Sequence, residues 1–157
     1  MTILVIISLC IFAAYLLPIC FVKGIPTSIS ESYYQLKRNQ FFFTIFLYSI
    51  CFLCVPKMLD ILKNSNFQFL GFLACVSIAF VGAAPMFKGN DKMIHFIAAG
   101  VAAFCAEIVM LFLTPYWYIS VGCFLASIYL IYKYKEQKIF WLEIAVFVPM
   151  YIILIIA

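Results

Sequence analysis

Long apolar runs fill almost the whole chain and leave no stretch long enough for a separate water-soluble domain. Apolar residues make up 68% of the 157 residues, and charged residues only 10%. A helix needs about 20 predominantly apolar residues to cross a hydrocarbon layer about 30 Å thick. Runs of about that length are 3–22, 40–56, 67–87, 93–114, 116–133 and 139–157. We therefore predict an all-α, multi-pass membrane protein in which residues 1–157 form a single bundle of six transmembrane helices.

The runs are continuously apolar, whereas the strands of a membrane barrel alternate apolar and polar residues. Backbone groups in hydrocarbon must be paired within their own segment, which favours helices. No Lys or Arg precedes the first run, so we expect a retained helix rather than a signal peptide. Among the prolines, we expect Pro56, Pro85 and Pro115 to close the second, third and fourth helices, and Pro18 and Pro149 to lie inside the first and last.

The basic residues are distributed unevenly between alternate loops. Eight of the ten fall in the first, third and fifth loops: Lys23, Lys37, Arg38, Lys88, Lys92, Lys133, Lys135 and Lys138. The second loop holds Lys57 and Lys63, and the fourth holds none. Because cytoplasmic loops collect Lys and Arg, we expect these three loops inside and both termini outside. The cytoplasmic membrane of a bacterium is the expected location, and the lipid bilayer is the expected partner.

Several function classes find no support in the composition. All seven cysteines lie in apolar runs, so Cys51-x-x-Cys54 is interpreted as helix packing rather than as a redox or zinc motif. No glycine-rich phosphate loop is present, and no basic run is long enough to suggest a nucleic-acid partner. We expect no cofactor, no resident metal and no catalytic residue that the sequence alone can identify.

Small residues indicate where helices approach one another closely, because lipid supplies no hydrophobic drive between them. The third run carries such residues four apart, and the fourth is rich in alanine. The predicted packing positions are Gly71, Cys75, Ala79, Ala83, Ala98 and Ala102. We place these two helices at the centre of the bundle. The Phe-rich first and second helices are expected to face lipid more, with Phe41, Phe42, Phe43, Phe46 and Phe52. A homo-oligomer or another membrane-protein partner held through a small-residue face remains open.

Polar groups at membrane depth are costly and point to function by default. His95 and Glu107 lie in the fourth run, and Glu143 lies in the sixth. At the rise of an α-helix, Glu107 is about 18 Å further along the axis than His95. Helical periodicity turns both residues towards the bundle interior. We expect Glu107 to be neutral and hydrogen-bonded to a neighbour, with Ser77, Ser127 and Tyr129 as candidates.

The first loop, 23–39, contains a second polar group. Ser28 followed by Glu31 fits a capping box that starts a short helix at about 28–37. This helix is expected either in the membrane interface or folded back into the bundle. Capping alone explains Ser28 and Glu31, and the functional alternative is that the segment covers a cavity lined by His95 and Glu143. The candidate functional cluster is therefore Ser28, Ser30, Glu31, Ser32, His95, Glu107 and Glu143.

The segment G-I-P-T-S-I-S-E-S-Y-Y after the first run resembles an S-x-S-[DE] element of small bacterial six-helix membrane proteins of uncharacterised activity. That resemblance covers most of the chain. More distantly, the chain is similar to the alkaline ceramidase-like (CREST) membrane hydrolases, which implies Ser, Asp and several His around zinc. Those enzymes have seven helices and three zinc-binding histidines, whereas this chain has only His95, so no catalytic residue is carried over.

Three functions compete at this stage. The best supported is permeation or transport of a small solute, an ion or protons, with Glu107 and His95 facing inward. The second is an interaction or effector protein that acts through helix contacts. The third is a lipid-active hydrolase with Ser30 or Ser32, Glu31, His95 and Glu143 at its site.

Overall fold

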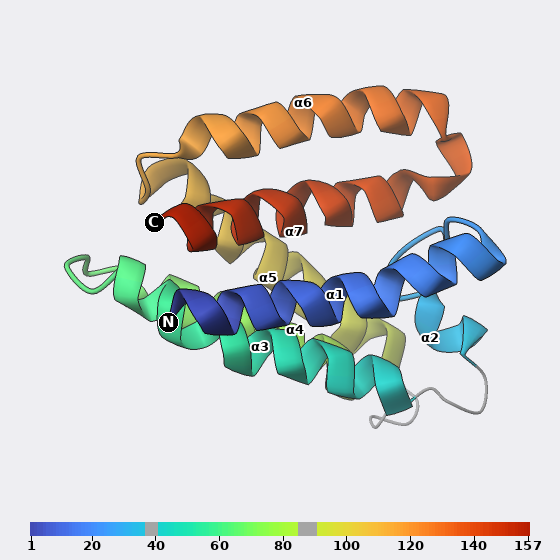
Figure 1. Ribbon diagram of the computed structural model, residues 1–157, viewed down its shortest axis with the longest axis horizontal. Helices are drawn as coiled ribbons and strands as arrows, with labels where there is room; N and C mark the ends of the chain where they lie inside the picture. Colours follow the sequence, from blue (N-terminus) through green and yellow to red (C-terminus); the bar gives the residue numbers. More distant parts are fainter. Residues whose placement is uncertain (37–40, 85–90) are drawn as a thin grey trace.

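The computed structural model describes residues 1–36, 41–84 and 91–157, which are helical apart from short turns (Figure 1). Its elements are α1 (Thr2–Lys23), α2 (Ser32–Gln35), α3 (Phe41–Ile61), α4 (Gln68–Ala83), α5 (Asp91–Phe112), α6 (Trp117–Lys133), the 3-10 helix η3 (Lys135–Gln137) and α7 (Lys138–Ile156). No strand occurs within these described ranges. The all-α prediction is therefore confirmed, and a helix lies at each predicted run.

Four of the helices are long and apolar enough to cross a membrane, namely α1, α3, α5 and α7. The apolar helices α4 and α6 have 16 and 17 residues, at or below the usual length for a crossing. Pro18 and Pro149 lie inside α1 and α7, as predicted. Pro85 lies outside the described residues.

The prediction that Pro56 closes the second helix is wrong, because α3 continues to Ile61. A proline removes one backbone donor and frees one carbonyl, but the packing of the flanking residues can hold the helix together across it. Cys54 and Met58 on either side of Pro56 are buried in the core. The longer helix places Lys57 inside α3, where its side chain is 92% buried, rather than in a loop.

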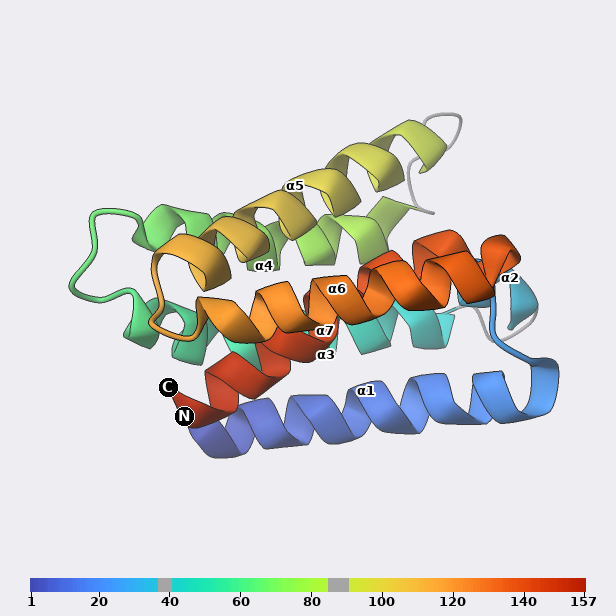
Figure 2. The ribbon, with the colours of Figure 1, turned by 90° about the horizontal axis from the view of Figure 1, so that it is seen from above.

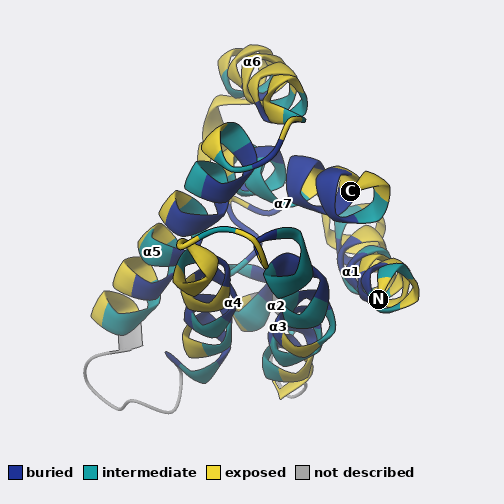
Figure 3. Cartoon of the chain, turned by 90° about the vertical axis from the view of Figure 1, so that its left-hand side faces the viewer, coloured by how far each residue is buried: buried dark blue, intermediate teal, exposed yellow. Residues whose placement is uncertain are grey.

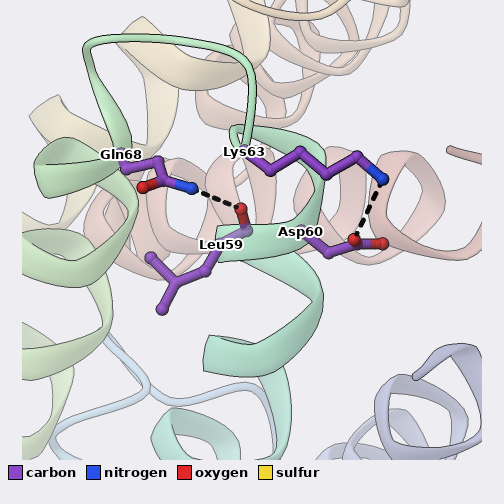
Figure 4. A network of polar contacts seen from close by, with 4 residues as sticks. All are labelled: Leu59, Asp60, Lys63 and Gln68. Atoms are coloured by element: carbon purple, nitrogen blue, oxygen red, sulfur yellow. Dashed lines mark hydrogen bonds and ion pairs between the residues drawn. The ribbon is translucent and has the colours of Figure 1, made fainter.

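The turn between α3 and α4 is held by polar contacts at its base (Figure 4). The Nε2 amide of Gln68, at the start of α4, donates to the backbone carbonyl of Leu59 at 3.3 Å. Lys63 and Asp60 form an ion pair at 3.5 Å with both side chains partly in solvent. Such exposed pairs contribute little free energy, so the apolar packing above the turn determines how the two helices meet.

Figures 1 and 2 show the two chain ends at the same end of the bundle, together with the α3–α4 and α5–α6 turns. We call this the terminal end. The opposite end, the loop end, carries α2, η3 and the start of α5. Seen end-on in Figure 3, α7 lies between α1 and α5, with α6 on the outside. The helix with the most neighbours is α7, which packs against α1, α3, α5 and α6.

The prediction that the third and fourth runs form the centre of the bundle is therefore only partly right. Helix α5 packs against α4, α6 and α7, whereas α4 packs mainly between α3 and α5. The expectation that the second helix faces lipid is wrong for Phe43 and Phe46, which are each 2% exposed and belong to the core. Their neighbours Phe41 and Phe42 are exposed, so only one face of α3 is available to lipid.

The small-residue stripe of α4 is used within the bundle. Gly71 and Cys75 are buried, and Ala79 and Ala83 are half-buried. A Cβ atom on Gly71 would lie 2.7 Å from Cγ of Met58 and 2.9 Å from Cδ1 of Leu62, both in or just after α3. The missing side chain therefore permits the close approach of α4 to α3. On α5, the predicted packing residues are also buried, namely Ala98 and Ala102.

This contact gives a matched pair of substitutions. Gly71→Leu should destabilise the folded protein by about 1–3 kcal/mol or more, because a full side chain overpacks the α3–α4 contact. Gly122→Leu on α6 is the control, since a Cβ atom there has no neighbour within 4 Å. Unfolding in detergent with increasing SDS, followed by circular dichroism, measures both. Equal stability of the two variants would contradict the close approach at Gly71.

Candidate functional site

The first loop folds back onto the loop end of the bundle and is tied to α7 at two backbone positions. The Phe140 amide donates to the Thr27 carbonyl at 2.9 Å. The Ile29 amide donates to Oε2 of Glu143 at 2.5 Å. Because the Ile29 side chain is 3% exposed, this segment is part of the packed bundle rather than a loose connection.

The capping box forms in a shifted arrangement. Oγ of Ser28 accepts the Glu31 amide at 3.0 Å, as an N-cap residue does. Oε2 of Glu31, however, accepts from the amide and the hydroxyl of Thr27, at 2.6 and 2.5 Å, rather than from the amide of Ser28. The predicted helix 28–37 is correspondingly too long: residues 28–31 form tight turns, and α2 covers only Ser32–Gln35. Positions 37–40 lie outside the described residues.

The two remaining serines of the loop have different surroundings. Ser32 is fully buried, donates to the Ile29 carbonyl at 2.5 Å and accepts from the hydroxyl of Tyr15 on α1 at 2.7 Å. Ser32 therefore connects the loop to α1 by hydrogen bonds. It lines neither of the two cavities described next. Ser30 is hydrogen-bonded to Ser28 at 3.0 Å and faces both cavities.

An inner cavity of about 410 Å³ lies between α3, α4, α5, α6 and α7, under the first loop. His95, Glu107 and Glu143 all line it. Most of its remaining wall is apolar and comes from side chains such as Leu47, Ile78, Val81, Ala102, Val146 and Met150. The three ionisable residues that the sequence analysis singled out therefore share one cavity, and Ile29 and Ser30 form its cover at the loop end.

An outer cavity of about 730 Å³ adjoins the inner one at the loop end, and the two share Ser30, His95 and Glu143 in their walls. Its other polar lining residues are Thr27, Ser28, Glu31, Tyr33, Tyr34 and Lys92. The outer cavity is thus more polar than the inner one. Of the seven candidate residues, all except Ser32 line one or both cavities.

The expected hydrogen bond from Glu107 to Ser77, Ser127 or Tyr129 is not formed. Within 1–36, 41–84 and 91–157, no hydrogen bond or ion pair reaches the Glu107 carboxyl. Oγ of Ser127 instead donates to the Phe124 carbonyl at 2.7 Å, one turn earlier on its own helix. The Cys123 thiol of α6 lies close enough to the Glu107 carboxyl to interact with it electrostatically. His95, at the other end of the cavity, faces the Val81 carbonyl of α4.

A second buried polar cluster joins α1, α3 and α7 outside the cavities. The Ser8 and Tyr151 hydroxyls are 2.8 Å apart, and Sγ of Cys54 donates to Oγ of Ser8 at 3.4 Å. Each group has a partner, so the cluster is explained by helix packing. All seven cysteines are free thiols.

The site holds residues that sequence reasoning did not select. Tyr15 and Thr27 support the loop, and Phe43, Phe104, Phe124 and Phe147 line the inner cavity. A hydroxyl within an apolar run was an available signal for Tyr15. The phenylalanines carried no such signal, because the chain contains 18 of them.

No group of three or more His, Cys, Asp and Glu residues suited to a metal ion occurs in the described part of the chain. Comparisons with known protein families, with curated proteins and with solved structures find no match to this chain. The site is therefore interpreted from its own geometry.

The anchoring of the loop by Glu143 can be tested by hydrogen exchange. Glu143→Ala should speed amide exchange in residues 27–31 by about 10–100-fold, because losing the acceptor of a buried amide costs about 1–3 kcal/mol. Glu143→Gln should retain slow exchange, since the amide oxygen still accepts from Ile29. Mass spectrometry of the protein in detergent measures the rates, and the exposed Glu136→Ala is the control. Unchanged exchange in Glu143→Ala would show that the loop is held by other contacts.

Proposed function

We propose that all six long helices cross a bilayer, with the loop end in the cytoplasm and both termini outside. Four helices have sufficient length and hydropathy by themselves. At 1.5 Å per residue, α4 and α6 reach about 24 and 26 Å, a mismatch that local thinning of the bilayer accommodates. Large apolar side chains are exposed on every long helix, which suits contact with lipid.

The ends of the helices support the same placement. Trp117 and Tyr118 at the start of α6 are exposed, and so is Tyr132 near its end, as expected for rings at the headgroup level. The described lysines at the loop end outnumber those at the terminal end: Lys23, Lys92, Lys133, Lys135 and Lys138 against Lys57 and Lys63. This asymmetry favours a cytoplasmic loop end, and we place the protein in a bacterial cytoplasmic membrane.

Within this topology, we infer that the protein moves a small solute, an ion or protons by way of the inner cavity. The observation that carries the proposal is that His95, Glu107 and Glu143 line one cavity at two depths. His95 and Glu143 lie near the loop end, and Glu107 lies about 18 Å deeper along α5. Ionisable residues that face a cavity inside a membrane bundle are the usual parts of substrate and proton pathways.

The alternative functions have weaker support. An effector role rests on small-residue faces, but Gly71 and Cys75 are buried inside the bundle and so are not free for a partner. A hydrolase site is favoured by the convergence of Ser30, Glu31 and His95 on the outer cavity. In the described residues, however, the hydroxyl of Ser30 is bonded to Ser28 rather than to His95, so no activated nucleophile is formed.

Transport through the inner cavity makes Glu107 essential. We expect Glu107→Gln to reduce proton or solute flux into liposomes at least tenfold, because the amide cannot exchange a proton or neutralise a cation. A pH-sensitive dye inside the vesicles measures proton flux, and a labelled solute measures uptake. Glu136→Gln makes the same chemical change on η3, outside both cavities, and should leave flux unchanged. Wild-type flux in the Glu107→Gln protein would exclude this mechanism.

A further inference from the structure

We propose that the inner cavity binds a small organic ammonium ion with an apolar body. This inference rests on the proposed transport function and names the chemical class of its substrate. Three features of the cavity favour such a ligand: its size, its apolar wall and the Glu107 carboxyl, which has no partner among the described residues.

The volume of the inner cavity, about 410 Å³, lies in the range of small-molecule sites. Its wall is apolar over most of its extent, so a hydrated inorganic ion would lose its water shell there without replacement. An organic molecule with an apolar body, in contrast, gains free energy by leaving water for such a wall. The wall therefore selects against a bare metal ion and favours an organic solute.

Among organic solutes, the Glu107 carboxyl in the inner cavity favours one that carries a positive charge. Glu107 lines its deep part without a partner among the described residues. An isolated carboxyl in apolar surroundings is either protonated or paired with a cation. The described titratable groups that share its surroundings are Glu143 and His95 in the same cavity and the Cys123 thiol on α6. None of the described wall residues is a Lys or Arg. A bound ammonium would then replace the proton that otherwise neutralises Glu107.

The aromatic side chains in the wall of the inner cavity also favour an organic cation. Four phenylalanines line the inner cavity, one from each of four helices: Phe43 of α3, Phe104 of α5, Phe124 of α6 and Phe147 of α7. The faces of aromatic rings attract organic cations, and desolvated contacts are the strongest. Phe104 and Phe124 are also exposed on the outer surface, so they stand at the edge of the cavity between α5 and α6.

The outer cavity extends this arrangement to the loop end. Glu31 and Glu143 supply carboxyl groups there, and Tyr33 and Tyr34 supply rings. The exposed Lys92 also borders the outer cavity, but it does not line the inner one. The ammonium group is therefore expected to be held in the inner cavity, near Glu107, rather than at the mouth.

Binding of a defined cation tests the proposal. Radiolabelled phenethyltrimethylammonium is equilibrated with the purified full chain in lipid nanodiscs, and empty nanodiscs give the background. We expect saturable binding that Glu107→Gln weakens at least tenfold and that Glu136→Gln leaves unchanged. Circular dichroism and size-exclusion chromatography confirm that each variant is folded.

A competition experiment on the wild-type protein needs no substitution. The unlabelled cation should displace the label at least tenfold more effectively than its uncharged isostere, in which carbon replaces the nitrogen. Equal displacement by the isostere, or wild-type affinity in Glu107→Gln, would overturn the ammonium proposal. If the cation does not bind but proton flux still depends on Glu107, the ammonium proposal fails and the transport function stands. If neither binding nor flux depends on Glu107, both fail.

Discussion

The exterior of this bundle is apolar, so each polar group must find its partner within the protein. Several of the described hydroxyl side chains follow this constraint. Thr114 donates to the Met110 carbonyl and Ser127 to the Phe124 carbonyl, each on the preceding turn. Thr44 of α3 donates to the Gly82 carbonyl of α4 at 2.9 Å and so joins two helices. In the described residues, Oγ of Ser120 and Nε1 of Trp141 are buried without a hydrogen-bond partner. The Glu107 carboxyl also has none there, and it differs from these two groups because it is ionisable and lines the inner cavity.

Glu143 serves two parts of the structure at once. Its carboxyl holds the Ile29 amide and so fixes the loop on the bundle, and the same residue lines both cavities. A ligand that competes for this carboxyl would also act on the loop that covers the inner cavity. The neighbouring bond from Phe140 to Thr27 involves backbone groups alone, so the loop would keep one attachment to α7 while the other is exchanged. The loop and the wall of the inner cavity are therefore linked through the Glu143 side chain.

The positions of the long helices and the inward direction of His95 and Glu107 could be predicted, because apolar length and helical periodicity are properties of a single segment. The continuation of α3 through Pro56 could not, since it depends on packing around Met58 that outweighs a local helix breaker. The same holds for Phe43 and Phe46: phenylalanine is equally suited to lipid and to a protein core, and only the neighbouring helices decide. In the site, the spacing of Ser28 and Glu31 indicated a cap, but it could not show that Glu31 reaches Thr27.

The depth of the inner cavity constrains how any solute could pass. The cavity extends from the cover at Ile29 to Glu107 and Met150. Beyond these residues, towards the terminal end, the core is packed with side chains such as Val109, Met110 and Leu154, each at most 2% exposed. In the described residues, the cavity is therefore covered by the first loop at the loop end and closed by packed side chains towards the terminal end. The proposed transport of an organic solute would require the helices around Val109 and Met110 to separate. Pro149 in α7, beside Met150, offers a weakened backbone position for such a movement.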